Sequence, residues 1–320
     1  MAEALGSGLL SPPRLSVLLS THNPDPAYLA RALEGLLAQT LPASDWELIV
    51  VDNASTPPLD STKLGLARHP RARLLREDQL GLLFGRLSGI DNSKGDLISF
   101  CDDDNVLAAD FLTRAVEIFS TYPRLGNASG KSTPEYEATP PAWASEFSGC
   151  LALRDFGEER RIGDGWTGSY PAFAFGGGGA LFRRKALVPF LAEFKSGTNL
   201  YIQGRTGKDL ASGEDNNFVL SVVKGGFSVG YFPELVTTHL IPTARLEKRY
   251  LGRLNHGIAK SWVQVLALHG ICPWQPVDSW TVPLRKARAY FRYHAWAGPA
   301  EYVRWRGACG HFEGQALIGK

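Results

Sequence analysis

The stretch that decides the fold of this chain is Leu97-Ile98-Ser99-Phe100-Cys101-Asp102-Asp103-Asp104-Asn105. An apolar run of strand length ends there in three consecutive carboxylates. Adjacent like charges repel one another, and with partial burial this raises their pKa values unless a cation joins them. The usual partner is a hard divalent ion such as Mg²⁺ or Mn²⁺ that is also bridged to substrate phosphates. The alternative is an acidic loop in which Asp104 or Asn105 only caps the next helix.

Strands and helices alternate around this stretch. Apolar runs predict three earlier strands, at 15–20, 46–52 and 72–76. Helices are expected from about residue 26, at 81–92 and at about 108–122. Because each strand is almost entirely apolar, we predict an α/β fold with a Rossmann-like, mostly parallel sheet and helices on both faces.

Polar residues follow several of the predicted strands. His22, Asp52 and the aspartates at 102–104 each come directly after an apolar run. In parallel sheets, ligands bind beyond the carboxyl ends of the strands. The sequence therefore predicts one ligand-binding rim, and this convergence is more specific than any single motif.

The second half of the chain has a looser pattern. We expect a long loop at 131–148 and a strand–turn–strand element at 172–184 around four glycines. A loop at 207–213 precedes a helix that runs to Lys224, and a strand returns at 227–232. We divide the chain into a disordered N-terminus (1–13), an α/β domain (14–244, with halves 14–122 and 123–244) and a C-terminal helical extension (245–320).

Composition limits the partners and the compartment. The chain has 320 residues and a formal net charge of +2, which gives no global attraction to nucleic acid. The four cysteines lie far apart and form no C-x-x-C pair, so we expect neither a zinc site nor a disulfide framework. This cysteine usage favours a reducing cytoplasm. No signal peptide and no apolar run of membrane-spanning length is visible. We expect a cytoplasmic protein that binds no nucleic acid and is at most peripheral at the inner face of a membrane.

The stretch 245–306 interleaves Arg and Lys with Trp, Tyr and Phe, among them Trp296, Tyr302 and Trp305. This pattern suits contact with an anionic membrane surface. It also suits a packed helical segment with solvated basic edges, and we favour this second interpretation.

Taken in order, the motifs resemble those of the inverting family-2 glycosyltransferases, which have the GT-A fold. The matching segments are 16–23, Val50-Val51-Asp52-Asn53-Ala54-Ser55, Gly81-x-x-x-Gly85-Arg86-x-x-Gly89, Asp102-Asp103-Asp104, Gly177-Gly178-Gly179-Ala180-Leu181-Phe182-Arg183 and Gly213-Glu214-Asp215 with Gly225-Gly226-Phe227. The resemblance covers about residues 14–242. Two positions depart from it, because the family commonly has Tyr in place of His22 and an Asn-type residue in place of Leu87.

The resemblance implies that residues 14–122 bind a nucleotide-diphosphate sugar, with a UDP-sugar as the expected donor. Asp52 would accept a hydrogen bond from the base or ribose, Thr21 and His22 would line the base pocket, and Asn23 would belong to the same nucleotide-sugar site. Arg86, near the start of a helix that faces the same rim, would clamp the diphosphate. From the residues alone, Asp52 can instead be a turn residue and Arg86 a solvated helix residue.

The resemblance also implies a metal site. Asp102 and Asp104, the outer members of the D-x-D pattern, would hold the ribose and the metal, and Asp103 would belong to the same nucleotide-sugar site. Asp104 is the better direct ligand for Mg²⁺ or Mn²⁺, which would neutralise charge on the β-phosphate as the sugar leaves. His239 is a candidate third ligand, although a lone histidine is more often structural.

The candidate catalytic pair is Glu214-Asp215. An inverting transfer is a single in-line displacement that needs one carboxylate to take the proton of the acceptor hydroxyl. By the resemblance, Asp215 would be this base and Glu214 a supporting or acceptor-binding carboxylate. The alternative is a capping box, Ser212-x-x-Asp215, whose acids only suit the helix dipole. Gly177, Gly178 and Gly179 would form the loop facing the donor or acceptor sugar.

Together these implications predict a metal-dependent inverting glycosyltransferase of polysaccharide or glycoconjugate synthesis, acting on a carbohydrate or lipid-linked acceptor. A sugar-nucleotide nucleotidyltransferase is the rival enzyme, but such enzymes usually carry a Gly-rich basic phosphate loop after the first strand. A nucleotide-sugar-binding protein without activity is the non-enzyme rival, which the presence of Asp102, Asp104 and Asp215 disfavours. A nicotinamide dehydrogenase is disfavoured because no G-x-G-x-x-G follows the first strand.

Overall fold

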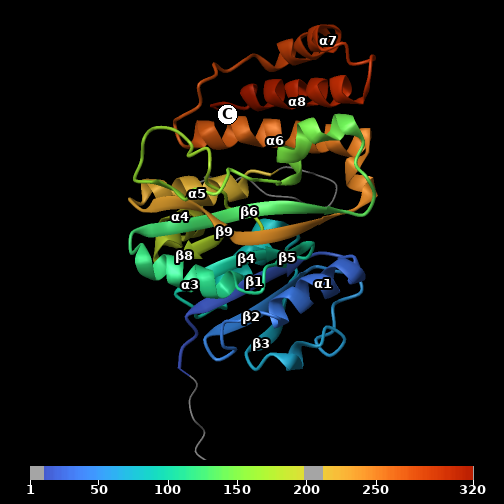
Figure 1. Cartoon of the computed structure of the whole chain (residues 1–320). Helices are drawn as coiled ribbons and strands as arrows, with labels where there is room; N and C mark the ends of the chain where they lie inside the picture. The colour runs from blue at the N-terminus through green and yellow to red at the C-terminus, as the bar shows by residue number, and fades with distance from the viewer. Residues whose placement is uncertain (1–10, 198–211, 320) are drawn as a thin grey trace, which may run out of the picture.

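The computed structural model describes residues 11–197 and 212–319. Within them a nine-stranded mixed sheet forms the centre of the molecule, with helices on both faces and a helical layer at one end (Figure 1). The strands are β1 (Leu15–Thr21), β2 (Trp46–Asn53), β3 (Ala72–Glu77), β4 (Leu97–Asp102), β5 (Asn105–Leu107), β6 (Leu125–Tyr136), β7 (Arg161–Gly163), β8 (Leu181–Arg183) and β9 (Ser228–Ile241). The α-helices are α1 (Pro26–Leu37), α2 (Leu82–Asp91), α3 (Phe111–Thr121), α4 (Arg184–Lys195), α5 (Glu214–Lys224), α6 (Lys248–Leu268), α7 (Val282–Arg292) and α8 (Pro299–Gln315). The 3₁₀ helices are η1 (Leu66–Arg68), η2 (Ala142–Leu151), η3 (Thr243–Leu246) and η4 (Ser279–Thr281).

The first half of the sheet is parallel, as the apolar runs predicted. Its strand order is β3-β2-β1-β4, and all three pairings between these neighbours are parallel. In the register of the pairings, Thr21 lies beside Asp52, and Ser20 lies beside Asp102. The carboxyl ends of β1, β2 and β4 therefore meet at one rim, and the predicted fold class is confirmed.

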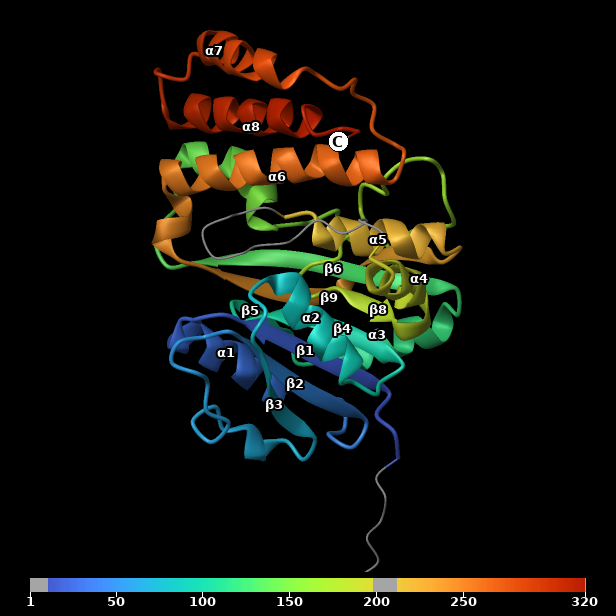
Figure 2. The same ribbon diagram turned by 180° about the vertical axis from the view of Figure 1, so that it is seen from behind.

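Two apolar cores explain why the central strands are apolar without interruption. Val17 and Leu19 of β1 pack with α1 and α3 on one face, while Leu18 packs with α2, α4 and α5 on the other. Figures 1 and 2 show these two faces from opposite sides. A strand buried on both faces has no solvent-facing side that could carry polar residues.

The second half of the sheet is mixed. Beyond β4 the order is β8-β6-β9-β5, with β7 paired to β9. β8 runs antiparallel to β4 and β6, whereas β6 and β9 are parallel. The antiparallel pairing of β5 with β9 sets Asn105 opposite His239. This pairing brings the last strand of the sheet to the residues that follow the acidic stretch.

The prediction of a long loop at 131–148 is wrong. β6 continues to Tyr136, and η2 occupies Ala142–Leu151. The strand escapes notice because it contains Pro134 and has partly exposed polar residues, so its local pattern is not that of a buried strand. Its second part is held instead by pairing with Val236–Ile241 of β9, about a hundred residues away in the sequence.

The strand–turn–strand element expected at 172–184 is only partly present. Residues 172–175 form no strand, β8 is restricted to Leu181–Arg183, and the unexpected helix α4 follows it at once. The returning strand is longer than predicted, because β9 runs through Pro233 to Ile241. Most of the loop expected at 207–213, and residues 1–10 of the expected disordered terminus, lie outside the described residues.

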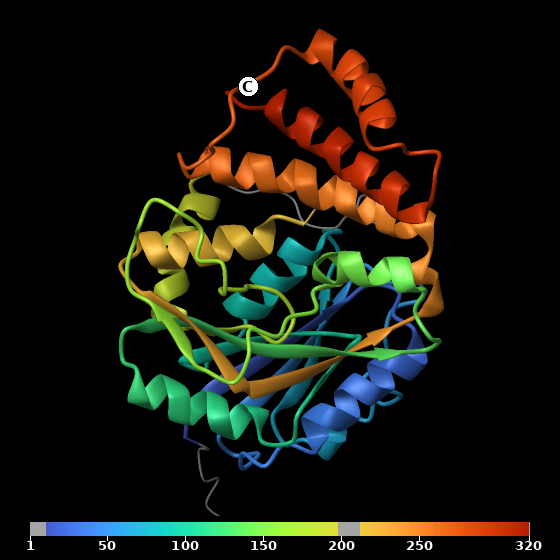
Figure 3. The ribbon, with the colours of Figure 1, turned by 45° about the horizontal axis from the view of Figure 1, so that its top comes forward.

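The C-terminal helices form a layer beyond β6 and β9. Of these three helices α6 lies nearest the sheet, α8 packs on α6, and α7 is outermost (Figure 3). α8 comes close to α6 at Gly310, which has no side chain. A Cβ added there would lie 2.0 Å from the carbonyl oxygen of His256. None of the described helices is both long and apolar enough to span a membrane.

Candidate active site

The candidate active site consists of two adjoining cavities beyond the strand ends. The central cavity, of about 290 Å³, lies between the end of β4, the start of α5, β9 and α6. The strand-end cavity, of about 200 Å³, is lined by Thr21, His22 and Asn53 at the ends of β1 and β2. Because Asp102 and Asp104 line both, the acidic stretch lies at their junction.

The three aspartates have different partners. Asp102 Oδ1 lies 3.4 Å from Nη2 of Arg86. Asp103 accepts a hydrogen bond from the Thr21 hydroxyl. Burial, followed by the negative charge of Asp104, raises the pKa of Asp103 to about 7 despite this hydrogen bond. The stretch therefore carries the mutual repulsion that its sequence implies.

Asp104 is buried and faces two basic side chains. Its Oδ2 lies 2.7 Å from Arg245 Nη1 and 3.4 Å from His239 Nε2. Its Oδ1 accepts a hydrogen bond of 2.5 Å from the side-chain amide nitrogen, Nδ2, of Asn105. The β5–β9 pairing holds this group together, since it fixes Asn105 against His239.

The ring of His239 presents Nε2 to the cavity. Its Nδ1 lies 2.9 Å from the Leu151 carbonyl oxygen, which can only accept, so Nδ1 carries the hydrogen. In the neutral ring Nε2 then keeps its lone pair, which faces Arg245 Nη1 at 3.1 Å. A histidine oriented in this way by a backbone carbonyl is the usual arrangement of a metal ligand.

The donor atoms at Asp104 and His239 suit the predicted divalent cation. One carboxylate oxygen and one imidazole nitrogen leave several positions for phosphate oxygens and water, which Mg²⁺ commonly retains. Across the described residues, no cluster of three or more His, Cys, Asp or Glu side chains could hold a metal ion on its own. The substrate would therefore have to complete the coordination, and Arg245 would have to shift away from Asp104 or share it.

Arg86 is almost fully buried and faces carboxylates. It forms ion pairs with Asp215 and Asp102, and Glu214 Oε1 lies 3.7 Å from its Nη1. Its guanidinium also stacks on the ring of Phe100. Burial lowers the pKa of Arg86, but the charges of the three carboxylates outweigh this effect and raise it above the ordinary value. The structure thus shows a bridge between β4 and α5, whereas contact with a diphosphate stays a prediction.

Glu214 and Asp215 begin α5 and face the central cavity. The capping box considered for this segment is absent, because Gly213 is the N-cap and no side chain caps the helix. Both carboxylates instead face Arg86, and Glu214 Oε2 also accepts from the Gly213 amide at 3.1 Å. Both acids still lie in the first turn of α5, where they suit the helix dipole, and a catalytic role for the pair stays a prediction.

The glycine run fits between the two sets of carboxylates. A Cβ added at Gly177 would lie 2.8 Å from Asp215 Oδ2, and one at Gly178 would lie 2.5 Å from Asp102 Oδ2. At Gly179 the backbone has φ of +80°, a conformation that favours glycine. The run is therefore required for the close approach of backbone to Asp102 and Asp215.

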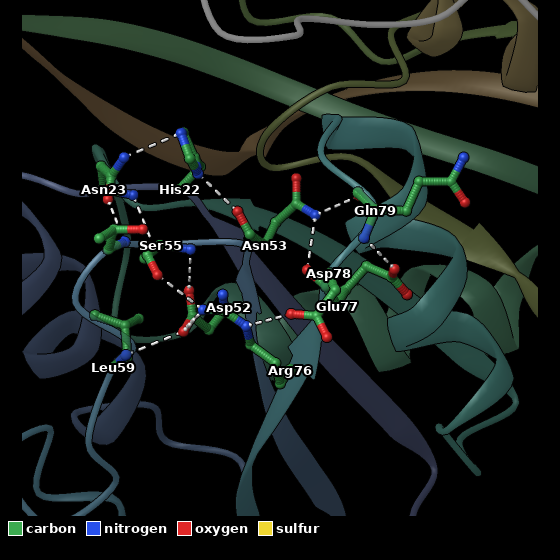
Figure 4. A network of polar contacts seen from close by, with 11 residues as sticks. His22, Asn23, Asp52, Asn53, Ser55, Leu59, Arg76, Glu77, Asp78 and Gln79 are labelled. Carbon is green, nitrogen blue, oxygen red and sulfur yellow. Dashed lines mark hydrogen bonds and ion pairs between the residues drawn. The ribbon is translucent and has the colours of Figure 1, made fainter.

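Asp52 is the centre of a loop-forming network (Figure 4). Its carboxylate accepts hydrogen bonds from the amides of Ser55 and Leu59, both at 3.0 Å, and pairs with Arg76 at 2.7 Å. Burial raises the pKa of Asp52, but these hydrogen bonds outweigh it, so the pKa lies below its ordinary value. The structure gives Asp52 the turn-forming role that the sequence left as its alternative, and nucleotide contact stays a prediction.

The residues after β1 divide between two surfaces. His22 contacts the Asn53 carbonyl oxygen through Nδ1 at 2.7 Å and lines the strand-end cavity with Thr21. Asn23 does not line that cavity; it bonds to Ser55 and to the Thr56 amide and borders a separate hollow beside α1 (Figure 4). Its side chain also bonds to His22 at 3.0 Å, and contact of Asn23 with the nucleotide stays a prediction.

Several residues of the central cavity were not assigned from the motifs, and three of them carry ionisable side chains that bear on the argument. They are Arg154, Tyr170 and Arg245. Arg245 was noted only as the first residue of the basic C-terminal stretch, although it follows the candidate ligand His239 by six positions. Arg154 and Tyr170 lie in the segment between β6 and β8, where no motif marks them.

Known proteins support the fold. The crystal structure of S. aureus TarS 1–349 in complex with UDP-GlcNAc superposes with a TM-score of 0.51 and 13% identity, covering 93% of this chain and 89% of that chain. The UDP complex of the same protein gives the same TM-score, identity and coverage. At this identity the likeness concerns the fold alone.

Two curated relatives cover most of the chain. An N-acetylglucosaminyltransferase of Sinorhizobium fredii is 27% identical over 251 residues, which are 75% of this chain and 55% of that protein. The succinoglycan biosynthesis protein ExoM of Rhizobium meliloti is 26% identical over 272 residues, or 82% and 78% of the two chains. This chain spans about half the length of the N-acetylglucosaminyltransferases it matches. The model of glycosyl transferase family 2 matches residues 16–188, and the chain belongs to that family.

Proposed function

We propose that this protein transfers a sugar from a nucleoside-diphosphate sugar to a hydroxyl group of an acceptor, with inversion at the sugar. The observation that carries the proposal is the convergence of Asp102, Asp104, Arg86 and Asp215 on one cavity beyond the strand ends. Family membership supports the same reaction class. UDP-GlcNAc is the first donor to test, since several relatives are named N-acetylglucosaminyltransferases and TarS has been crystallised with it.

The strand-end cavity is the expected place for the nucleotide. His22 and Thr21 offer ring and hydroxyl surfaces at its mouth, and Asp102 lies at the junction with the central cavity. The diphosphate would then lie near Asp104, Arg245 and His239. Asp104 and His239 would hold Mg²⁺ or Mn²⁺, which when bound would neutralise charge on the leaving diphosphate.

Asp215 is the proposed general base. In an in-line displacement the acceptor oxygen forms a bond to the anomeric carbon while the bond from that carbon to the diphosphate oxygen breaks. The proton of the acceptor hydroxyl passes to the base. Arg86 fixes the direction of the Asp215 carboxylate, and Glu214, buried against the same guanidinium, supports this geometry.

Peripheral contact with the inner face of a membrane is a further part of the proposal. An exposed set of side chains on and around α7, here called the α7 patch, consists of Trp280, Leu284, Phe291, Trp296, Arg285, Arg288 and Arg292. Residues 279–300 contain no Asp or Glu. Large apolar side chains beside unopposed arginines are typical of helices that lie on anionic lipid. A lipid-linked acceptor would be present at the same membrane surface.

Donor hydrolysis and transfer test the proposal. We expect the protein to release UDP from UDP-GlcNAc or another UDP-sugar when Mn²⁺ or Mg²⁺ is present, and faster when an acceptor is added. Pyrophosphate release from a nucleoside triphosphate and a sugar phosphate would point instead to a nucleotidyltransferase. Tight UDP-sugar binding without turnover across a broad panel of acceptors would favour the inactive binding protein.

A further inference from the structure

Three arginines line the central cavity, and their surroundings differ. Arg86 is paired with Asp215 and Asp102, and Arg245 is paired with Asp104. Arg154 has no carboxylate within ion-pair distance in the part of the chain that the structure describes. One cationic side chain of the cavity is therefore left without an anionic partner from the described protein.

Arg154 is held firmly in its place. Its amide donates to the carbonyl of Ser132 at 3.1 Å, and its own carbonyl accepts from the Ser132 amide at 2.8 Å. This isolated antiparallel bridge ties the residue to β6. Its guanidinium stacks on the ring of Phe175, which directly precedes the glycine run. The cation is thus anchored from both its backbone and its side chain.

The position is electrostatically unfavourable for an isolated cation. Burial in the cavity wall lowers the pKa of Arg154 to about 9, and the nearby Tyr170 and Asp215 only partly oppose this effect. The guanidinium stays protonated at neutral pH but has lost part of its solvation. A partly buried charge without an anionic partner is unfavourable, so an anion that binds there would gain a charge-assisted hydrogen bond.

We propose that Arg154 recognises a carboxylate or phosphate group on the acceptor and holds it beside Asp215. This inference rests on the proposed function. Arg154 borders the central cavity but not the strand-end cavity, where the nucleotide is expected. Arg86 and Arg245 already pair with Asp102 and Asp104. Arg154 is therefore the arginine of the cavity that can bind an anion on the acceptor. A planar guanidinium binds both carboxylate and phosphate with two parallel hydrogen bonds.

Matched pairs of acceptors test this inference. Methyl β-D-glucuronide is compared with methyl β-D-glucoside for a carboxylate, and sn-glycerol 3-phosphate with glycerol for a phosphate. Binding to the UDP-loaded protein is followed by NMR line broadening, and transfer is followed by UDP release with the donor that the enzyme turns over. Because a hydrogen bond to a charged group is lost in the neutral member, we expect the acidic member of one pair to be preferred by about 10–100-fold.

The variants separate recognition from folding. Arg154→Gln should abolish the preference, Arg154→Lys should retain part of it, and both should bind UDP as the wild type does. The matched control is Arg161→Gln, an exposed arginine of β7, which should keep the full preference. Equal binding of acidic and neutral members by the wild type, or an unchanged preference in Arg154→Gln, overturns the inference. Absence of turnover with every donor overturns the proposed function, while the binding arm still decides the role of Arg154.

Discussion

The two sides of the site use their polar residues in different ways. At the ends of β1 and β2, Asp52, His22 and Asn53 bond to neighbouring loops and hold the backbone in shape. Around the central cavity, Arg86 and Asp215 pair across elements that are 129 residues apart in the sequence. The polar residues at the ends of β1 and β2 therefore stabilise loops beside the strand-end cavity. Those of the central cavity form ion pairs that line the cavity itself.

This difference teaches that position at the strand ends does not by itself identify a reacting group. Asp52 and Asp102 both end parallel strands but lie one register position apart, since Asp52 pairs with Thr21 and Asp102 with Ser20, and only Asp102 lines a cavity of the site. The network around Asp52 already uses both of its carboxylate oxygens. Loss of turnover is therefore expected from changes on the cavity side, and loss of stability with turnover retained in the folded protein from changes on the loop side.

Asp215→Asn should give the largest effect on the cavity side. General-base catalysis is typically worth about 10²–10⁴-fold, so transfer should fall by about that factor while UDP affinity is kept. The rate of transfer, calorimetric UDP binding and the melting temperature should be measured on one preparation. If Asp215→Asn retains activity and Glu214→Gln loses it, the base is Glu214.

Removal of the cation site should come next. Asp104→Ala should reduce the gain in UDP affinity that Mn²⁺ provides by at least about 10–100-fold. Mutation of a residue that only supports a metal ligand typically costs that much metal affinity, and Asp104 is proposed as a direct ligand. Calorimetry with and without Mn²⁺ measures the gain, and Asp110→Ala, on the exposed start of α3, serves as the control. Unchanged metal-dependent affinity in Asp104→Ala would rule out this ligand.

Gly178→Ala tests whether the glycine run shapes the charged assembly. The new Cβ would lie 2.5 Å from Asp102 Oδ2, so Asp102 or the loop must move. Overpacking of this kind costs about 1–3 kcal/mol, and we expect turnover to fall as well. Gly225→Ala is the matched control, because its nearest atoms are 3.3 Å away. Equal activities of the two variants would contradict the proposed fit.

Asp52→Asn should act on the loop side, through stability. Loss of its ion pair and weakened hydrogen bonds should cost about 1–3 kcal/mol at pH 7. Since the pKa of Asp52 is lowered in the folded protein, this stabilisation is present above the unfolded pKa of about 3.9 and is lost as the pH falls below it. The melting temperatures of the two proteins should begin to converge below about pH 4 and continue to converge as the pH falls through the lowered folded pKa of Asp52. Reduced nucleotide affinity at unchanged stability would restore Asp52 to the binding site.

The smallest effect is expected at the α7 patch, which lies far from both sides of the site in the outermost helix (Figure 3). Trp280→Ser with Phe291→Ser should reduce co-sedimentation with anionic vesicles at low salt and leave turnover of a water-soluble acceptor unchanged. Val188→Ser, at an exposed position of α4, is the control. No binding of the wild type to anionic vesicles would leave these side chains without a membrane role.

The sequence predicted the parallel half of the fold well because its signals are local. The apolar runs at β1, β2 and β4 each report their own burial, and the turn residues after them mark their ends. β6 was missed because it is stabilised by pairing with β9, and its own residues alternate weakly around Pro134. Helix α4 was missed because it begins directly after β8, with no capping residue to announce it.

The candidate site follows the same division. The carboxylates at 102–104 and 214–215 stand in recognisable motifs, so they could be named from the sequence. Arg245, which pairs with Asp104, and Arg154 could not be named in this way, because they reach the cavity only through the packing of η3 and the bridge to β6. The closeness of Gly177 to Asp215 is likewise a contact between distant segments that no local pattern encodes.

The short pairing of β5 with β9 has a consequence for how this chain can change in length. It consists of three residue pairs, with Asn105 opposite His239 at one end. A slip of one residue would turn every side chain of that part of β9 to the other face and remove His239 from Asp104. A single residue added within 237–239 is therefore not compatible with the site.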